Sequence, residues 1–287
     1  MNIAITGSSG NIGGMVARHL NSRGLPLILP LRNPAKAPVL PNCEARRFAY
    51  GDLELAKQAL NGVDVLFMVS AAESPTREQE HLTLVQAASE AGVQHMVYLS
   101  FAQAALDCTF TLARTHAVTE NAILQTNMRY TFLRDNFYSE MMATIANADG
   151  IIAGPADDGR VACVSQHDVA QAAANVIADI ACDNHRHDNQ TYYTLTGSQS
   201  LSFAEIAAVL TEITGKPHYY HNETLEEAFA SRKAAYPDTP DWQIEAWVST
   251  YTAIAKGELA TVSDDLSQLL GRAPLNFEDV VKAQYAK

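Results

Sequence analysis

Short runs of β-branched and other apolar residues alternate, along the first half of the chain, with segments whose apolar residues recur every three or four positions. The apolar runs predict strands over 2–6, 26–31, 45–50, 63–70, 94–100 and 130–134. The periodic segments predict helices over 12–22, 53–60, 76–91 and 111–126. This alternation is typical of a parallel, doubly wound α/β sheet with right-handed crossovers.

The pattern becomes less regular beyond Arg134. It predicts a helix near 139–148, a loop over 150–159, a helix after Asp168 and a strand over 191–196. We therefore expect a Rossmann domain over residues 1–135. A smaller C-terminal α/β lobe is expected over 136–287, interleaved with the first domain and contributing a substrate pocket.

Composition narrows the class of protein. The chain has 287 residues, 47% of them hydrophobic, which is enough for a packed core. Its net charge of -12 would repel a nucleic-acid backbone, so nucleic acid is excluded as a partner. No apolar run approaches the roughly 18 residues that span a bilayer, so we expect a cytoplasmic protein without a membrane partner. The four cysteines are scattered, which favours neither a metal site nor a disulfide framework.

The strongest motif is the glycine-rich segment GSSGNIGG at 7–14, placed between a predicted strand and a predicted helix. Gly7 permits a tight turn, Gly10 lets the backbone approach a pyrophosphate, and Gly13 lets the helix pack closely on the strand. The other loop residues expected at the cofactor are Ser9, Asn11 and Ile12. An ordinary strand-to-helix turn is the alternative, but the surrounding elements favour dinucleotide binding.

The end of the second predicted strand selects the cofactor. An NAD-specific site usually has an acidic residue there, whereas this chain has Arg32, with Lys36 four residues later. A guanidinium can hold a 2′-phosphate with two hydrogen bonds, and Lys36 adds a second positive charge. NADP(H) is therefore the expected cofactor, with a solvated basic turn as the alternative.

The carboxyl ends of parallel strands face the ligand crevice. We therefore expect residues at the ends of the fourth and fifth strands to surround the nicotinamide. These residues are Met68, Val69, Ser70, Ser100 and Phe101.

Several further segments, taken with the glycine loop, resemble the NmrA-like atypical short-chain dehydrogenases, and most of all their quinone oxidoreductase and triphenylmethane reductase type. These segments are 50–52, 98–100, 131–138, 255–258 and 263–266. The resemblance runs nearly end to end, and the stretch FLRDNFY at 132–138 is its most telling part. Asp52, in the first of these segments, is added to the candidate cofactor-binding residues.

Most short-chain dehydrogenases protonate a carbonyl with a tyrosine that precedes a lysine by four residues. No tyrosine of this chain has a lysine four residues later, and Leu112 and His116 stand where that pair would be. This argues against a sugar epimerase or an ordinary alcohol dehydrogenase. The reductases that the chain resembles share the departure, which implies acceptors that take hydride readily, such as quinones and triarylmethane dyes.

His116, Asn136 and Tyr138 are the candidate catalytic residues. His116 can bond the nicotinamide ribose or an acceptor oxygen, although a histidine satisfied by a neighbour is equally expected. Asn136 and Tyr138 follow the sixth strand and flank the same site. Phe101, Phe137 and Tyr138 are candidates for stacking on a flat acceptor, with a place in the core as the equal alternative. For Phe137 the core is the expected place.

Two further features favour a structural role. Trp242, Trp247 and Tyr251 have helical spacing and are expected to pack in the core, with a lid as the alternative. Asp168 is expected to stabilise the start of a helix.

Two functions remain from the sequence. The first is an NADPH-dependent reductase that transfers hydride directly to a small aromatic or quinone-like substrate, without a metal or flavin. The resemblance also implies a second, because NmrA-like proteins include regulators that bind NADP(H) without turnover. With either function, the protein could form a homodimer.

Overall fold

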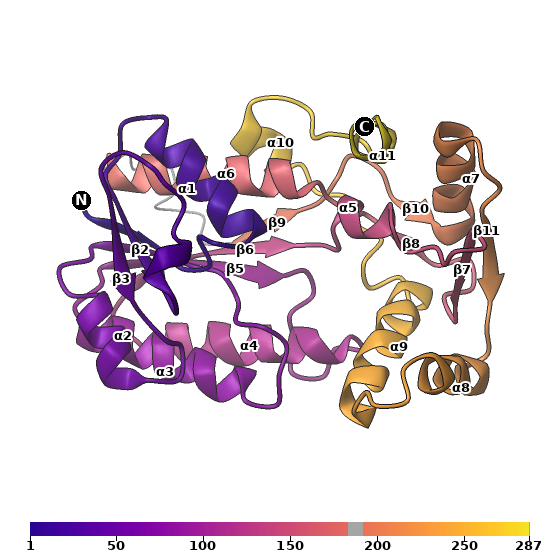
Figure 1. Ribbon diagram of the computed structural model, residues 1–287, viewed down its shortest axis with the longest axis horizontal. Coiled ribbons are helices and arrows are strands. Elements are labelled where there is room, and N and C mark those ends of the chain that lie inside the picture. Colours follow the sequence, from indigo (N-terminus) through magenta and orange to yellow (C-terminus); the bar gives the residue numbers. More distant parts are fainter. Residues whose placement is uncertain (183–191, 287) are drawn as a thin grey trace.

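A parallel sheet of seven strands forms the centre of the computed structural model, which describes residues 1–182 and 192–286 (Figure 1). The strand order is β3-β2-β1-β4-β5-β6-β9. The strands are β1 (Ile3–Ile5), β2 (Leu27–Leu31), β3 (Cys43–Arg47), β4 (Val65–Met68), β5 (His95–Phe101), β6 (Arg129–Asp135) and β9 (Tyr192–Leu195). The order reverses between β1 and β4, and ligands bind at such a switch point in doubly wound sheets.

Helices cover both faces of the sheet (Figure 1). One layer contains α1 (Asn11–Asn21), α6 (Gln166–Ala181) and α10 (Asp265–Leu270), and the other contains α2 (Leu53–Ala59), α3 (Arg77–Glu90) and α4 (Thr111–Leu124). Strand residues alternate between the two cores: Ile3 and Ile5 pack in the first, and Ala4 packs in the second. The predicted α/β fold class is confirmed.

The C-terminal lobe is built from short elements (Figure 1). β7 (Ile151–Gly154) pairs in parallel with β11 (Tyr219–Asn222), and β8 (Arg160–Val161) pairs antiparallel with β10 (Leu201–Ser202). Its helices are α5 (Ser139–Met142), α7 (Phe203–Thr214), α8 (Leu225–Ala235), α9 (Asp241–Ala255) and α11 (Phe277–Tyr285). Between these elements the chain returns to the main sheet, because α6 packs on α1 and β9 pairs with β6.

Two local expectations were wrong. The helix predicted near 139–148 ends at Met142, and the loop predicted over 150–159 contains β7. Asn147 explains the first difference, since its side chain accepts the N–H groups of Asp149 and Ile151 at 3.0 and 2.9 Å. These bonds offer the backbone an alternative to the helix. Residue 191, the first of the predicted strand 191–196, lies outside the described residues.

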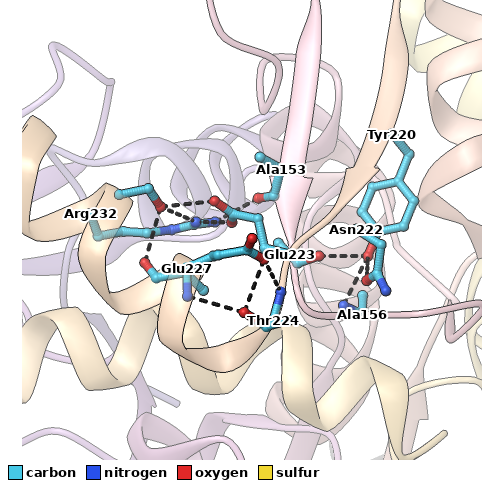
Figure 2. Close-up of polar contacts among 11 residues, drawn as sticks. Ala153, Ala156, Tyr220, Asn222, Glu223, Thr224, Glu227 and Arg232 are labelled. Carbon is cyan, nitrogen blue, oxygen red and sulfur yellow. Dashed lines mark hydrogen bonds and ion pairs between the residues drawn. The ribbon is translucent and has the colours of Figure 1, made fainter.

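A buried ion pair joins the strands of the lobe to its helices (Figure 2). Glu223 pairs with Arg232 of α8, and the Arg232 guanidinium also donates to the carbonyl of Ala153 in β7 at 2.5 Å. Arg232 lies over the ring of Tyr251 in α9, 5.3 Å from its centroid. Tyr251 is therefore part of the packed lobe. Trp247 packs against Tyr236 with ring centroids 5.2 Å apart, and Trp242 is half-buried.

Asp168, in the first turn of α6, is fully buried. Its carboxylate accepts hydrogen bonds from the Arg272 guanidinium and from the N–H of Leu275, both at 2.6 Å. It therefore holds the segment after α10 against α6, which is a structural role. In the described part of the chain, the helices are all too short or too polar to cross a membrane.

Candidate functional site

The glycine loop leaves β1 and turns directly into α1. Gly7 has a φ of +64°, and the N–H of Gly10 bonds its carbonyl at 2.8 Å. A Cβ atom on Gly13 would lie 2.5 Å from the Gly7 carbonyl oxygen, so only glycine allows this close packing. Gly10 caps α1 without a side-chain hydrogen bond, which leaves the first-turn N–H groups to an outside acceptor. The loop therefore fits a bound pyrophosphate.

Two cavities meet at this loop, over the carboxyl ends of the strands. One, of about 410 Å³, lies beside the ends of β2 and β3 and is lined by Arg32, Phe48 and Tyr50. The other, of about 530 Å³, lies over the ends of β4, β5 and β6. Gly7, Ser9 and Ser70 line both cavities. The shared lining makes one cleft that crosses the loop, as an extended dinucleotide requires. We call its two parts the β2–β3 cavity and the β4–β6 cavity.

The two basic candidates lie on different sides of the loop. The exposed Arg32 lines the β2–β3 cavity. Lys36 is in the short helix Pro34–Lys36 and lines a neighbouring surface hollow. This hollow also borders the β4–β6 cavity, with which it shares Ser9, Gly10, Asn11 and Gln166. Of the two basic residues, only Arg32 lines the β2–β3 cavity.

Most of the candidate cofactor residues line the β4–β6 cavity: Gly7, Ser9, Gly10, Asn11, Ile12, Gly13, Val69, Ser70 and Phe101. Three candidates lie elsewhere. Met68 is fully buried between the sheet and the α2–α3 layer, and the buried Ser100 donates to Glu120 at 2.5 Å. Asp52 caps α2 by accepting the N–H of Leu55 at 3.0 Å. Met68 and Ser100 each precede a residue that lines the cavity, namely Val69 and Phe101. Because successive strand residues face opposite sides of a sheet, Met68 and Ser100 face away from the cavity.

Phenylalanines form an apolar wall of the β4–β6 cavity. Phe101, Phe110 and Phe137 pack together with each pair of ring centroids 5.1 Å apart. The expectation that Phe137 is a core residue is met, since it is 8% exposed, yet it also lines the cavity. Phe110 was not among the sequence candidates. An aromatic wall of this kind suits an apolar aromatic molecule.

His116 lines the same cavity, and both of its ring nitrogens have partners. Arg77 donates to Nε2 at 2.9 Å, and Nδ1 lies 2.9 Å from the Tyr98 hydroxyl. Since arginine only donates, Nε2 accepts and Nδ1 carries the proton. Burial, followed by the charge of Arg77, lowers the pKa of His116 well below its usual value. His116 is therefore a neutral histidine satisfied by its neighbours, rather than a free acid.

Arg77 brings a buried positive charge to the cavity wall. The residue is 6% exposed and lines the β4–β6 cavity, and its Nε has no hydrogen-bond partner in the described part of the chain. Within residues 1–182 and 192–286, no carboxylate lies within ion-pair distance of its guanidinium. A buried, unneutralised cation favours anions beside it. Nothing in the sequence pattern singled out Arg77.

The end of β6 supplies the remaining polar groups. The buried Asn136 donates to the Leu259 carbonyl at 3.0 Å and accepts from the N–H of Phe137 at 2.8 Å, so its amide holds the backbone in place. Tyr138 donates its hydroxyl to the carboxyl of Asp135, and both residues line the β4–β6 cavity. Burial raises the pKa of Asp135 to about 8. Sequence reasoning missed Asp135, although it ends a strand that points at the cleft.

Comparisons with known proteins agree with this geometry. A family model described as NAD(P)H-binding matches residues 7–180. Quinone oxidoreductase 2 of Escherichia coli (strain K12) is 32% identical, over 97% of this chain and 97% of its own. An NAD(P)H azoreductase of Xenophilus azovorans is 30% identical, over 99% and 98%. The structure of Citrobacter sp. triphenylmethane reductase, complexed with NADP(H), superposes with a TM-score of 0.85 at 31% identity and covers 99% of both chains.

Proposed function

The chain belongs to the NAD(P)H-binding family, and from this premise we propose that it is an NADPH-dependent reductase of quinones or related conjugated acceptors such as triarylmethane dyes. The resemblance to NmrA-like atypical short-chain dehydrogenases of the quinone and dye reductase type is confirmed. The acceptors enter the proposal because two of the relatives are named as reductases of such compounds.

The β4–β6 cavity carries the proposal. It continues directly from the phosphate loop, and its walls combine the Phe101–Phe110–Phe137 cluster with the buried cation of Arg77. The phenylalanines hold a flat acceptor and exclude water from one side. Arg77 stabilises the negative charge that grows on the acceptor oxygen, because a fixed cation in a site of low polarity acts strongly on developing charge.

NADPH, when bound, supplies the hydride. The N–H groups at the start of α1 hold its pyrophosphate, and Arg32 holds the 2′-phosphate from the β2–β3 cavity. Ser70 lies where the two cavities meet, and Val69 lines the β4–β6 cavity beside it. Both would face the nicotinamide half. His116 orients Arg77 through its Nε2.

A regulator that only senses NADP(H) is the rival function. It would need the phosphate loop but no second cavity shaped for an acceptor. A cavity that combines this apolar wall with a buried cation favours the reductase. Cytoplasmic location and formation of a homodimer stay predictions.

We expect the purified protein to oxidise NADPH with small quinones, and to leave aliphatic ketones, aldehydes and nucleotide sugars unchanged. The reason is basicity: a reduced quinone carries its charge on a phenolate, whereas a simple ketone gives a far more basic alkoxide. Absorbance of NADPH, followed across such a panel, measures this. Tight NADPH binding without turnover of any acceptor would favour the sensor instead.

Arg32→Ala is expected to weaken NADPH binding by about 10- to 100-fold and to leave NADH binding nearly unchanged, because charged hydrogen bonds of this kind contribute roughly 1.5–3 kcal/mol. Calorimetric titration of both cofactors measures it. Lys36→Ala is the matched comparison, since Lys36 lines the neighbouring hollow and not the β2–β3 cavity. A larger loss from Lys36→Ala would place the 2′-phosphate in that hollow.

A further inference from the structure

A buried carboxyl group and a tyrosine hydroxyl share one hydrogen bond at the wall of the β4–β6 cavity. Asp135 is the last residue of β6 and is 4% exposed. It is fixed between two strands, since it pairs with Phe101 of β5 and Leu195 of β9. Tyr138 is held by its pairing with Val164 and directs its hydroxyl to the Asp135 carboxyl. The pair is therefore rigid and open to the acceptor.

The surroundings keep a proton on this pair. Burial raises the pKa of Asp135 to about 8, so the carboxyl is largely protonated at neutral pH. Burial, followed by Asp135 and Glu140, raises the pKa of Tyr138 well above its usual value. Glu73, the neutral His116 and Arg77 also line the cavity. In the described part of the chain, no cation lies within ion-pair distance of Asp135 to stabilise its carboxylate.

Reduction of a quinone to a hydroquinone needs a proton in addition to the hydride. We infer that Asp135 and Tyr138 deliver this proton to the reduced acceptor oxygen, with Tyr138 as the donor in contact and Asp135 as the proton source behind it. The inference rests on the proposed function. It does not replace the missing tyrosine and lysine pair, because burial raises the pKa of Tyr138 where that lysine would lower it. Simple ketones, whose reduction gives a far more basic alkoxide, therefore remain poor acceptors.

The step balances in protons and charge. The Tyr138 O–H bond breaks and an O–H bond forms on the acceptor oxyanion, which becomes a hydroquinone hydroxyl. For this step the Tyr138 O–H turns from the Asp135 carboxyl to the acceptor. The proton of the carboxyl turns to the Tyr138 oxygen and is transferred to it, which reverses the direction of their hydrogen bond. Asp135 is left as a carboxylate and regains a proton from solvent before the next turnover. Because the two groups interact closely, the pair titrates as a unit.

Kinetics of Asp135→Asn and Tyr138→Phe test the inference, with Tyr236→Phe as a control outside the cleft. For wild type, kcat/KM is expected to fall as the pH rises through about 8, because the protonated pair is required. Asp135→Asn should lose this fall and be about 10-fold slower at pH 7. Across a series of quinones, the fall in rate that Asp135→Asn causes should grow as the oxygen of the reduced quinone becomes more basic. A merely structural role would slow every quinone alike.

A second measurement needs no turnover. The infrared carbonyl band of a protonated carboxyl should be present at pH 6, disappear as the pH rises through about 8, and be absent in Asp135→Asn. An ionised Asp135 at pH 6, or an unchanged pH profile in Asp135→Asn, overturns the inference alone. A wild type that reduces no acceptor overturns both the inference and the proposed function, so the two failures are distinguishable.

Discussion

Gly10→Val is expected to abolish NADPH binding while leaving the protein folded. In the free protein, a Cβ atom on Gly10 meets only the Gly7 carbonyl oxygen, at 3.3 Å, which a small local shift relieves. Gly10 lines the β4–β6 cavity at the start of α1, where the backbone must approach the pyrophosphate. The valine methyl groups would occupy that volume. We expect a loss in affinity of about 100-fold or more, or at least ~2.7 kcal/mol.

Gly13→Ala is the matched comparison, because it changes the fold rather than the ligand. Its Cβ atom would lie 2.5 Å from the Gly7 carbonyl oxygen and 2.7 Å from that of Thr6, and these backbone atoms cannot yield without moving β1 from α1. Circular dichroism and thermal unfolding should therefore separate the variants: Gly10→Val stays close to wild type, and Gly13→Ala unfolds earlier. A folded Gly10→Val protein that binds NADPH normally would show that the loop is only a turn.

The sheet could be predicted because its strands and the helices that cover it have apolar residues at regular spacing in the sequence. Ile3 and Ile5 alternate with Ala4, and the glycine loop follows the first strand at the spacing that a bound pyrophosphate requires. The sequence pattern of the C-terminal lobe is weaker. β8 and β10 are two residues long, and β7 pairs with β11 more than sixty residues later in the chain. Pairings so short and so distant have no local periodicity.

The cofactor half of the site was also easier to predict than the acceptor half. The glycine loop depends on backbone geometry, which the residue types record directly. The candidates at the strand ends included Met68 and Ser100, which do not line the cavity, because a predicted strand boundary does not fix which face a residue takes. Arg77, Phe110 and Asp135 were missed because their significance lies in burial and in neighbours from other elements. Spacing along the chain carries neither.

Two buried histidines beneath the cleft should make the fold sensitive to acid. His81 is fully buried: its Nε2 accepts the N–H of Ala71 at 2.9 Å, so its Nδ1 carries the proton that bonds Thr119 at 2.8 Å. Burial, followed by the charge of Arg77, lowers the pKa of His81 to about 3. The same causes lower the pKa of His116. Both rings are therefore neutral in the folded protein.

The direction of the effect follows from proton binding. Below pH 6.5 the unfolded chain takes up a proton at each histidine while the folded protein does not. Their contribution to stability is therefore complete above pH 6.5 and is lost as the pH falls toward the folded values. Each histidine should cost roughly 1.4 kcal/mol of unfolding free energy per pH unit below 6.5. Asp135 acts in the opposite direction between its unfolded pKa and about 8, since its folded form keeps a proton that the unfolded chain releases.

Asp135 and the other carboxyl groups contribute equally to the unfolding free energies of wild type and a histidine variant. The difference between the two proteins therefore isolates the histidine. Urea unfolding of wild type and His81→Gln at several pH values between 5 and 7.5 should give curves that converge in acid, because the variant lacks one of the two buried rings. The slope of its unfolding free energy against pH should be smaller by about 1.4 kcal/mol per unit. His221→Gln, at an exposed position, is the control and should parallel the wild type. Parallel curves for His81→Gln would mean that this ring binds its proton as readily in the folded protein as in the unfolded chain, and that the neutral network beneath the cleft is wrongly assigned.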